Sequence, residues 1–140
     1  MAAYNKFNSF VADVANKVHN LGADVLKVML TDTAPVAGNT VKANIPEIGA
    51  GNGYVAGGAV VAIASSAQVA GLYKLMATAN TTFTASGGSI GPFRYAVIYN
   101  DTSPSDNLIG WWDFGSEVTL TVGNTFTVGY DSINGILQLQ

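Results

Sequence analysis

Three aspartates in the second half of the sequence are the first candidates for chemistry. Asp101 and Asp106 bound a polar loop, and Asp113 follows two adjacent tryptophans. A glycosidase needs two carboxyl groups held about 5 Å or about 6.5–9.5 Å apart, one with a raised pKa. Asp101 and Asp106 lie among Ser, Thr, Asn and Pro, which are typical of turns and do not bury a carboxyl group. Asp113 is the better candidate for a perturbed pKa, but no acidic partner stands at a fixed spacing from it.

A second catalytic pattern is the run Gly-Gly-Ser-Ile-Gly at 87–91, which has the G-x-S-x-G form of a nucleophile elbow. That motif needs a strand before it, a helix after it and a histidine later in the chain. Here a proline and an expected strand follow, and the only histidine, His19, lies far upstream. We therefore interpret Ser89 as a turn residue.

The glycine-rich run at 49–53 resembles a phosphate-binding loop only superficially. It lacks the third-glycine spacing of a dinucleotide site and the Lys-Ser/Thr pair of a P-loop. His19 has no second ligand at metal-binding spacing, and the chain has no cysteine. We expect His19 on the surface of a helix, and we expect neither a metal ion nor a cofactor.

Trp111 and Trp112 raise a third possibility, a platform for sugars. In a strand their side chains point to opposite faces, so one can be core while the other is exposed. An exposed tryptophan could stack on a sugar or on a protein partner. The structural alternative places Trp112 in the core with Leu108 and Phe114, and packs Trp111 under the helix or a loop.

One segment has a helical period. Apolar residues step by four, three, four and three positions from Phe7 to Leu21, and Phe10 widens the stripe. Gly22 follows at a position suited to a left-handed helix end. The pattern predicts an amphipathic helix over residues 4–21. Because about 17 residues form only a marginal helix in isolation, its apolar face must pack on this domain or on a neighbour.

The rest of the chain has the period of two and the turn residues of β-structure. Residues 33–58 form an irregular segment rich in Gly and Pro, with at most a short strand at 41–45. Ser65-Ser66 is among the expected turns, and strands are expected near 24–32, 54–64, 68–78, 81–85, 93–100, 108–114, 117–122, 125–130 and 134–139. This spacing predicts a mainly β protein, an antiparallel jelly roll or β-sandwich over 24–140 that forms a single domain, 1–140, with the helix.

The turn at Gly123-Asn124 leads to a sharper prediction. If it closed a two-residue hairpin, Val122 would pair with Thr125, and the apolar sets of the two strands would lie on opposite faces of one sheet. Either the loop has three residues with a bulge, or the two strands belong to different sheets. We favour different sheets, which is usual in a jelly roll.

The composition limits the classes of partner. Charged residues are 11% of the chain, against about 25% in an ordinary soluble domain, while hydrophobic residues are 49%. The net charge of −3 and the lack of a basic run argue against direct nucleic-acid binding. No secretory signal is visible, and the most apolar stretch, 59–77, is too interrupted to span a membrane. Few charges and much apolar surface favour faces that other chains cover.

Three segments carry a resemblance that covers nearly the whole chain: GNGYVAGG at 51–58, GPFRYAVIYND at 91–101 and LIGWWDFG at 108–115. In these the sequence resembles the capsid cement, or head-decoration, proteins of tailed phages. The resemblance implies a non-enzymatic jelly-roll protein of the virion that binds the outer capsid surface. It also implies bridging of neighbouring major capsid protein subunits, homodimers, and synthesis in the host cytoplasm.

Contact regions follow as expectations. We expect them at the helix, in the glycine-rich segment 46–58, in the loop 100–107 and at one tryptophan, through Phe7, Phe10, Glu47, Asn52, Tyr54, Asp101, Asp106 and Trp111. The alternative is a carbohydrate-binding or tail-associated β-sandwich module that would recognise glycans with Trp111 and Tyr54.

Overall fold

A computed structural model describes all residues, 1–140, and shows a mainly β protein in which every pair of strands is antiparallel. In chain order the elements are β1 (Tyr4–Lys6), α1 (Ser9–Ala15), β2 (Leu26–Thr31), the 3₁₀ helix η1 (Lys42–Asn44), β3 (Ala59–Val60), β4 (Ile63–Val69), β5 (Leu72–Ala77), β6 (Thr81–Thr84), β7 (Ile90–Asn100), β8 (Leu108–Leu120), β9 (Thr125–Val128) and β10 (Leu137–Leu139). The largest sheet has the order β1-β8-β7-β2-β3, and two smaller sheets have the orders β10-β5-β4 and β6-β9.

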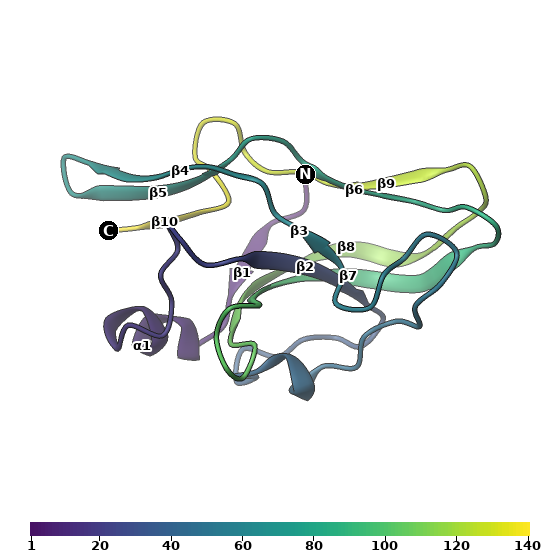
Figure 1. Ribbon diagram of the computed structural model, residues 1–140, viewed down its shortest axis with the longest axis horizontal. Coiled ribbons are helices and arrows are strands. Elements are labelled where there is room, and N and C mark those ends of the chain that lie inside the picture. Colours follow the sequence, from purple (N-terminus) through teal and green to yellow (C-terminus); the bar gives the residue numbers. More distant parts are fainter.

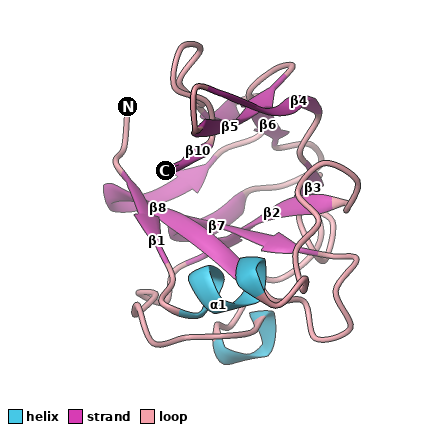
Figure 2. Cartoon of the chain, turned by 90° about the vertical axis from the view of Figure 1, so that its left-hand side faces the viewer, coloured by secondary structure: helices cyan, strands magenta, loops and turns pink.

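The three sheets and the helix lie in layers. Figure 1 shows the two smaller sheets above the five-stranded sheet, with α1 and η1 below it. The perpendicular view of Figure 2 shows the same order, with the five-stranded sheet in the middle. Both faces of the central sheet are therefore covered.

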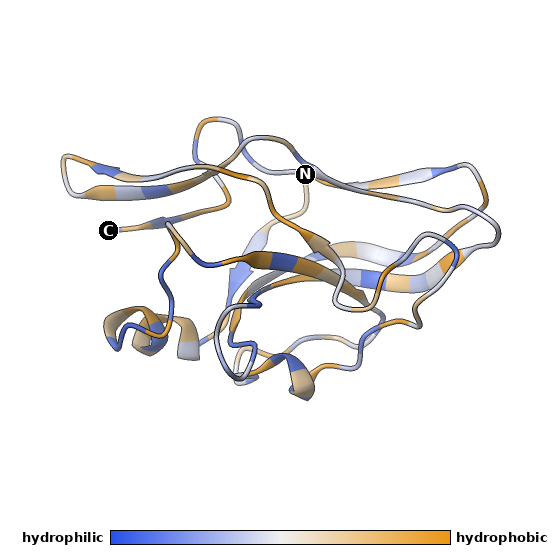
Figure 3. Ribbon diagram, viewed as in Figure 1, coloured by the Kyte–Doolittle hydropathy of each residue, from blue (hydrophilic) through white to orange (hydrophobic).

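The central strands show why this arrangement suits the sequence. In β2, Val28 and Leu30 face the larger apolar core under the smaller sheets, while Met29 faces a second cluster on the helix side. In β7, Ile98 and Tyr99 divide in the same way. Strands buried on both faces have continuous apolar runs, and Figure 3 shows hydrophobic colour over most of β2 and β3.

The predicted helix over 4–21 is wrong in extent. Residues 4–6 instead form β1, which pairs with β8 so that Tyr4 lies opposite Trp112, and α1 ends at Ala15. Lys17 then adopts a positive φ of 63°. Half of the apolar residues of the stripe are buried, two are half-buried and one is exposed. The chain places them with a strand, two helical turns and a loop in place of one long helix. The free edge of β8 gives residues 4–6 backbone partners that a solvent-facing helix turn would lack.

Two strand predictions also need correction. Ser65-Ser66 is no turn, because both residues lie inside β4, and the turn falls at Ala70-Gly71, where φ is 51° and 83°. The segment 41–45 contains η1 in place of a strand. In addition, the expected strands at 108–114 and 117–122 are one continuous strand, β8.

The prediction made from Gly123-Asn124 is confirmed. β8 belongs to the five-stranded sheet, whereas β9 pairs only with β6, with Phe83 opposite Phe126. The chain therefore crosses from one layer to the other at this turn. The Phe126 ring also contacts Phe93 and Phe114, with ring centroids 4.8 Å and 4.7 Å away, so the crossing joins the layers.

Candidate interaction surface

Glu47 is the anchor of the irregular segment 33–58. Its side chain is only 14% exposed, and its Oε1 accepts hydrogen bonds of 2.6 Å from the Tyr54 hydroxyl and of 2.6 Å from the Gly57 N–H. Its Oε2 lies 3.0 Å from Lys42 Nζ. One carboxylate thus holds three points of the segment together.

Two tyrosines attach this segment to the central sheet. The Tyr54 hydroxyl accepts a hydrogen bond of 3.0 Å from the Leu30 N–H of β2, and the Tyr99 hydroxyl donates one of 2.7 Å to the Gly57 carbonyl. Burial, and then the neighbouring Glu47, raise the pKa of Tyr54 far above its usual value. Burial likewise raises the pKa of Tyr99. Both phenols are therefore neutral donors, and the segment is fixed despite its lack of regular structure.

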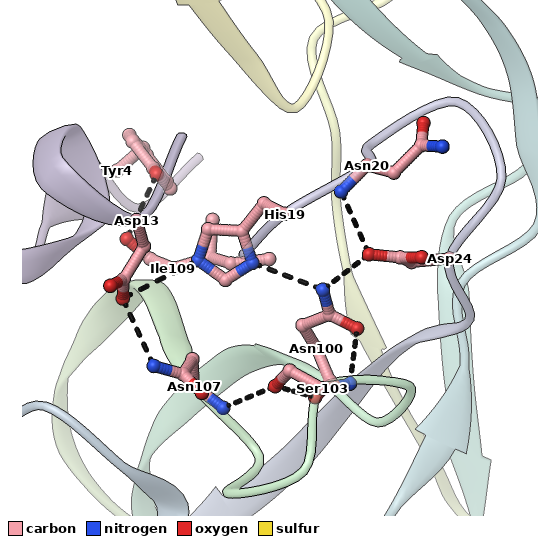
Figure 4. Close-up of polar contacts among 9 residues, drawn as sticks. All are labelled: Tyr4, Asp13, His19, Asn20, Asp24, Asn100, Ser103, Asn107 and Ile109. Atoms are coloured by element: carbon pink, nitrogen blue, oxygen red, sulfur yellow. Dashed lines mark hydrogen bonds and ion pairs between the residues drawn. The ribbon is translucent and has the colours of Figure 1, made fainter. Parts of the chain in front are cut away.

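A second polar cluster surrounds His19 (Figure 4). The side chain is fully buried, in contrast to the surface position that we expected. Its Nδ1 lies 3.0 Å from Asn100 Nδ2, which also donates to Asp24 Oδ2. Its Nε2 has no hydrogen-bond partner and lies 3.8 Å from Asp13 Oδ2. Burial lowers the pKa of His19, although Asp13 and Asp24 oppose that effect, so the neutral imidazole is favoured.

Asn100 connects this cluster to the loop 100–107. Its Oδ1 accepts from the N–H groups of Thr102 and Ser103, at 2.9 Å and 3.1 Å. Ser103 Oγ donates to the Asn100 carbonyl and accepts from the Asn107 N–H. Because Ser103 Oγ makes both bonds within the loop and none to His19, the cluster lacks the serine–imidazole contact of a nucleophilic site. Its geometry is that of a polar network which shapes a loop.

Asp101, Asp106 and Asp113 have different surroundings and do not form a pair of carboxyl groups. Asp101 Oδ2 is 2.9 Å from Lys27 Nζ, and Asp106 adopts a positive φ of 52° at the turn of the loop. Asp113 forms a two-bonded pair with Arg94, at 2.8 Å and 2.9 Å, and this guanidinium lowers the pKa of Asp113. Asp101 and Asp106 therefore remain half-exposed candidates for contacts, while Asp113 has a partner that the sequence did not identify.

Three of the predicted contact residues are buried within the chain itself. Phe7 and Phe10 are 0% and 1% exposed, and Tyr54 is 2% exposed. The correction has a common cause: each ring fills a space under the central sheet or beside it, so none can contact a partner without unfolding. Glu47 is likewise occupied by internal bonds, as described above.

Asn52 and Trp111 keep exposed surface. Asn52 is exposed, and its Nδ2 donates a hydrogen bond of 2.8 Å to the Ser89 carbonyl. Trp111 is half-buried against Phe7, with ring centroids 4.5 Å apart, while Trp112 is core. Trp112 is in the core beside Phe114, as the structural interpretation expects, but Leu108 lies in the other cluster. Trp111 packs on Phe7, two residues before α1 begins.

The most exposed regular element is β4, in the middle of which a turn at Ser65-Ser66 was predicted. From Ala64 to Val69 every residue of β4 is exposed, and the strand forms the edge of its sheet. Apart from its pairing with β5, β4 makes no backbone hydrogen bond. Beside it, side chains of β4 and β5 line a shallow groove of about 470 Å³ with four hydrophobic residues: Ala67, Val69, Leu72 and Met76.

No helix combines the length and hydropathy needed to cross a membrane. No three His, Asp or Glu side chains converge as a metal site requires. In comparisons with known proteins, the chain matches no protein-family model, no curated protein and no solved structure.

Proposed function

We propose that this chain is a non-enzymatic structural protein of a phage virion. In this proposal it binds the outer surface of the capsid, bridges neighbouring major capsid protein subunits and stabilises the shell. The resemblance to capsid cement proteins suggests the capsid as the partner. The low content of charged residues supports a protein that works by adhesion. The crossing of the chain between layers at β8 and β9 supports a jelly-roll β-sandwich as its fold type.

The observation that carries the proposal is the free edge of β4. Proteins usually shield such edges by short strands, lysines or prolines. β4 has seven residues with neither a charge nor a proline, whereas the other edge strands of its own sheet and of the central sheet have two or three residues. Beyond a register shift near Ile63, the regular part from Ser65 to Val69 pairs with β5 on one side only, so its outward backbone groups are unpaired. Such an edge is suited to pairing with another chain.

The occupant that fits this edge best is a second copy of the chain. Val69 and Leu72 close the two-residue turn as a hydrogen-bonded pair, so Ser66 and Gln68 direct their backbone groups away from β5. A two-fold axis at Ala67 pairs Ser66 with Gln68 of the second copy and places a small residue where the strands approach most closely. The segment brings no like charges together, which favours self-pairing.

Ala67→Cys tests this dimer, because the chain has no other cysteine. Residues facing each other at a non-hydrogen-bonded position have Cα atoms about 4.5 Å apart, within the range of disulfides. We expect mild oxidation to give a covalent dimer of Ala67→Cys. Val122→Cys, which is exposed but outside the edge, is the matched control. Equal cross-linking of the two variants, or a wild-type chain that is monomeric by light scattering, would contradict the dimer.

Sedimentation with mature phage heads tests the capsid proposal. We expect the chain to sediment with heads that lack it, with an occupancy that saturates. A matched incubation with tails and with host polysaccharide separates the alternative of a tail-associated or carbohydrate-binding module. That alternative is weakened in its original form, since the buried Tyr54 cannot stack on a sugar. Binding to polysaccharide or tails without binding to heads would overturn the proposal.

A further inference from the structure

The side-chain amide of Asn100 has one orientation that satisfies its surroundings. Its Nδ2 faces Asp24 Oδ2 at 2.6 Å, and a carboxylate can only accept hydrogen bonds. Its Oδ1 faces the N–H groups of Thr102 and Ser103, which can only donate. A flip of the amide would therefore break three interactions at once. Asn100 is fully buried, so no solvent replaces those partners.

This fixed amide determines the chemical state of His19. The second hydrogen of Asn100 Nδ2 is directed at His19 Nδ1, 3.0 Å away, so Nδ1 must be an acceptor. The neutral imidazole then carries its proton on Nε2. A second proton, on Nδ1, would set two donors against each other in a buried site, at a cost that neither group can avoid by rotation.

We propose that His19 is a proton-operated latch, which holds the loop 100–107 closed while its imidazole is neutral and releases it when Nδ1 gains a proton. The inference goes beyond the proposed function, because it depends only on the contacts of this cluster. The loop is also one of the regions in which we expect contacts with the shell, so the latch offers control of that surface.

The charged and polar groups around the imidazole determine how readily it gains a proton. Asp13 faces it from α1 and Asp24 from the segment before β2, and both carboxylates favour the charged form. Lys17 and Tyr73 line the adjoining groove. Burial acts against the charge and is the largest effect on the pKa of His19. Since that pKa is lowered in the folded chain, the closed state is fully stable above about pH 6.5 and loses stability as the pH falls through the folded value.

Amide hydrogen exchange measured by NMR tests the latch on the full chain. The amides of Thr102 and Ser103 report on the loop. The Ile136 amide, which donates to the Leu75 carbonyl of β5, is a reference far from the loop in sequence. After correction for intrinsic exchange, we expect opening of the loop to increase by up to about tenfold per pH unit below pH 6.5. The reference amide should not change.

His19→Asn is the matched variant, because its Oδ1 stands where Nδ1 does and cannot titrate. We expect its loop amides to keep constant protection between pH 7.5 and 5. The wild-type imidazole gives a second measurement that needs no variant, since the chain has one histidine. We expect the Nε2–H tautomer and a titration below pH 6.5. An Nδ1–H tautomer, a titration above pH 6.5, or the same pH dependence in wild type and His19→Asn would overturn the proposal.

Discussion

The segment 33–58 and the hairpin of β4 and β5 reverse the usual association between regular structure and firm attachment. The segment has almost no regular structure, yet a buried carboxylate and two tyrosine hydroxyls fix it to the central sheet. The hairpin is regular, yet β4 is exposed from Ala64 onward and has no partner on its outer side. Polar groups that are hydrogen-bonded within the chain fix its own structure, whereas unpaired backbone groups offer a surface to another chain.

The largest effect is expected at Gly58, where the irregular segment lies against β2. Gly58 has a φ of 79°, and a Cβ there would overlap the Val28 backbone carbonyl. We expect Gly58→Ala to lower the free energy of unfolding by roughly 2–5 kcal/mol, from overpacking and the left-handed conformation. Gly49→Ala is the matched control, since its Cβ meets nothing within 4 Å. Denaturant unfolding that gives equal values for both variants would show that the segment is not fixed at β2.

A smaller effect is expected at the anchor itself. Glu47→Gln removes the charge that two short hydrogen bonds and Lys42 share, at a cost of about 1.5–3 kcal/mol in unfolding free energy. The control is Glu117→Gln on the surface, where neighbouring Asp32 raises the pKa of Glu117 and so disfavours its charge. We expect that control to leave thermal unfolding unchanged or to raise its midpoint slightly. A harmless Glu47→Gln would remove the contrast between the two regions.

The sequence predicts the parts of this fold that depend on a local pattern. The period of two and the turn residues predicted strands at 24–32 and 93–100, where β2 and β7 lie. The phase of Val122 against Thr125 separated β8 from β9 correctly. The helix prediction failed because the same spacing of apolar residues can be buried without a helix. Phe7 is buried from the end of a strand and Leu21 from a loop. Period alone cannot distinguish these routes.

The polar sites were harder to predict, because their partners are far apart in sequence. Asn100 and His19 are separated by 81 residues, and Glu47 bonds to side chains and backbone that no short motif relates to it. Tyr54 stood out as a tyrosine in a glycine-rich run, but such a residue is equally compatible with an internal anchor and with a contact to a partner. At β4, the pair Ser65-Ser66 suggested a turn through its composition, while Ala70-Gly71 took that role.

The most direct test of the account compares Ala67→Lys with Val122→Lys on mature heads. Both substitutions add one charge at an exposed position, but only the first places like charges opposite each other across the paired β4 strands. Neither should change the unfolding free energy by more than about 0.5 kcal/mol. We predict that Ala67→Lys lowers the occupancy of heads by sedimentation while Val122→Lys binds as wild type. Equal occupancy of the two variants would contradict a binding role for the β4 edge.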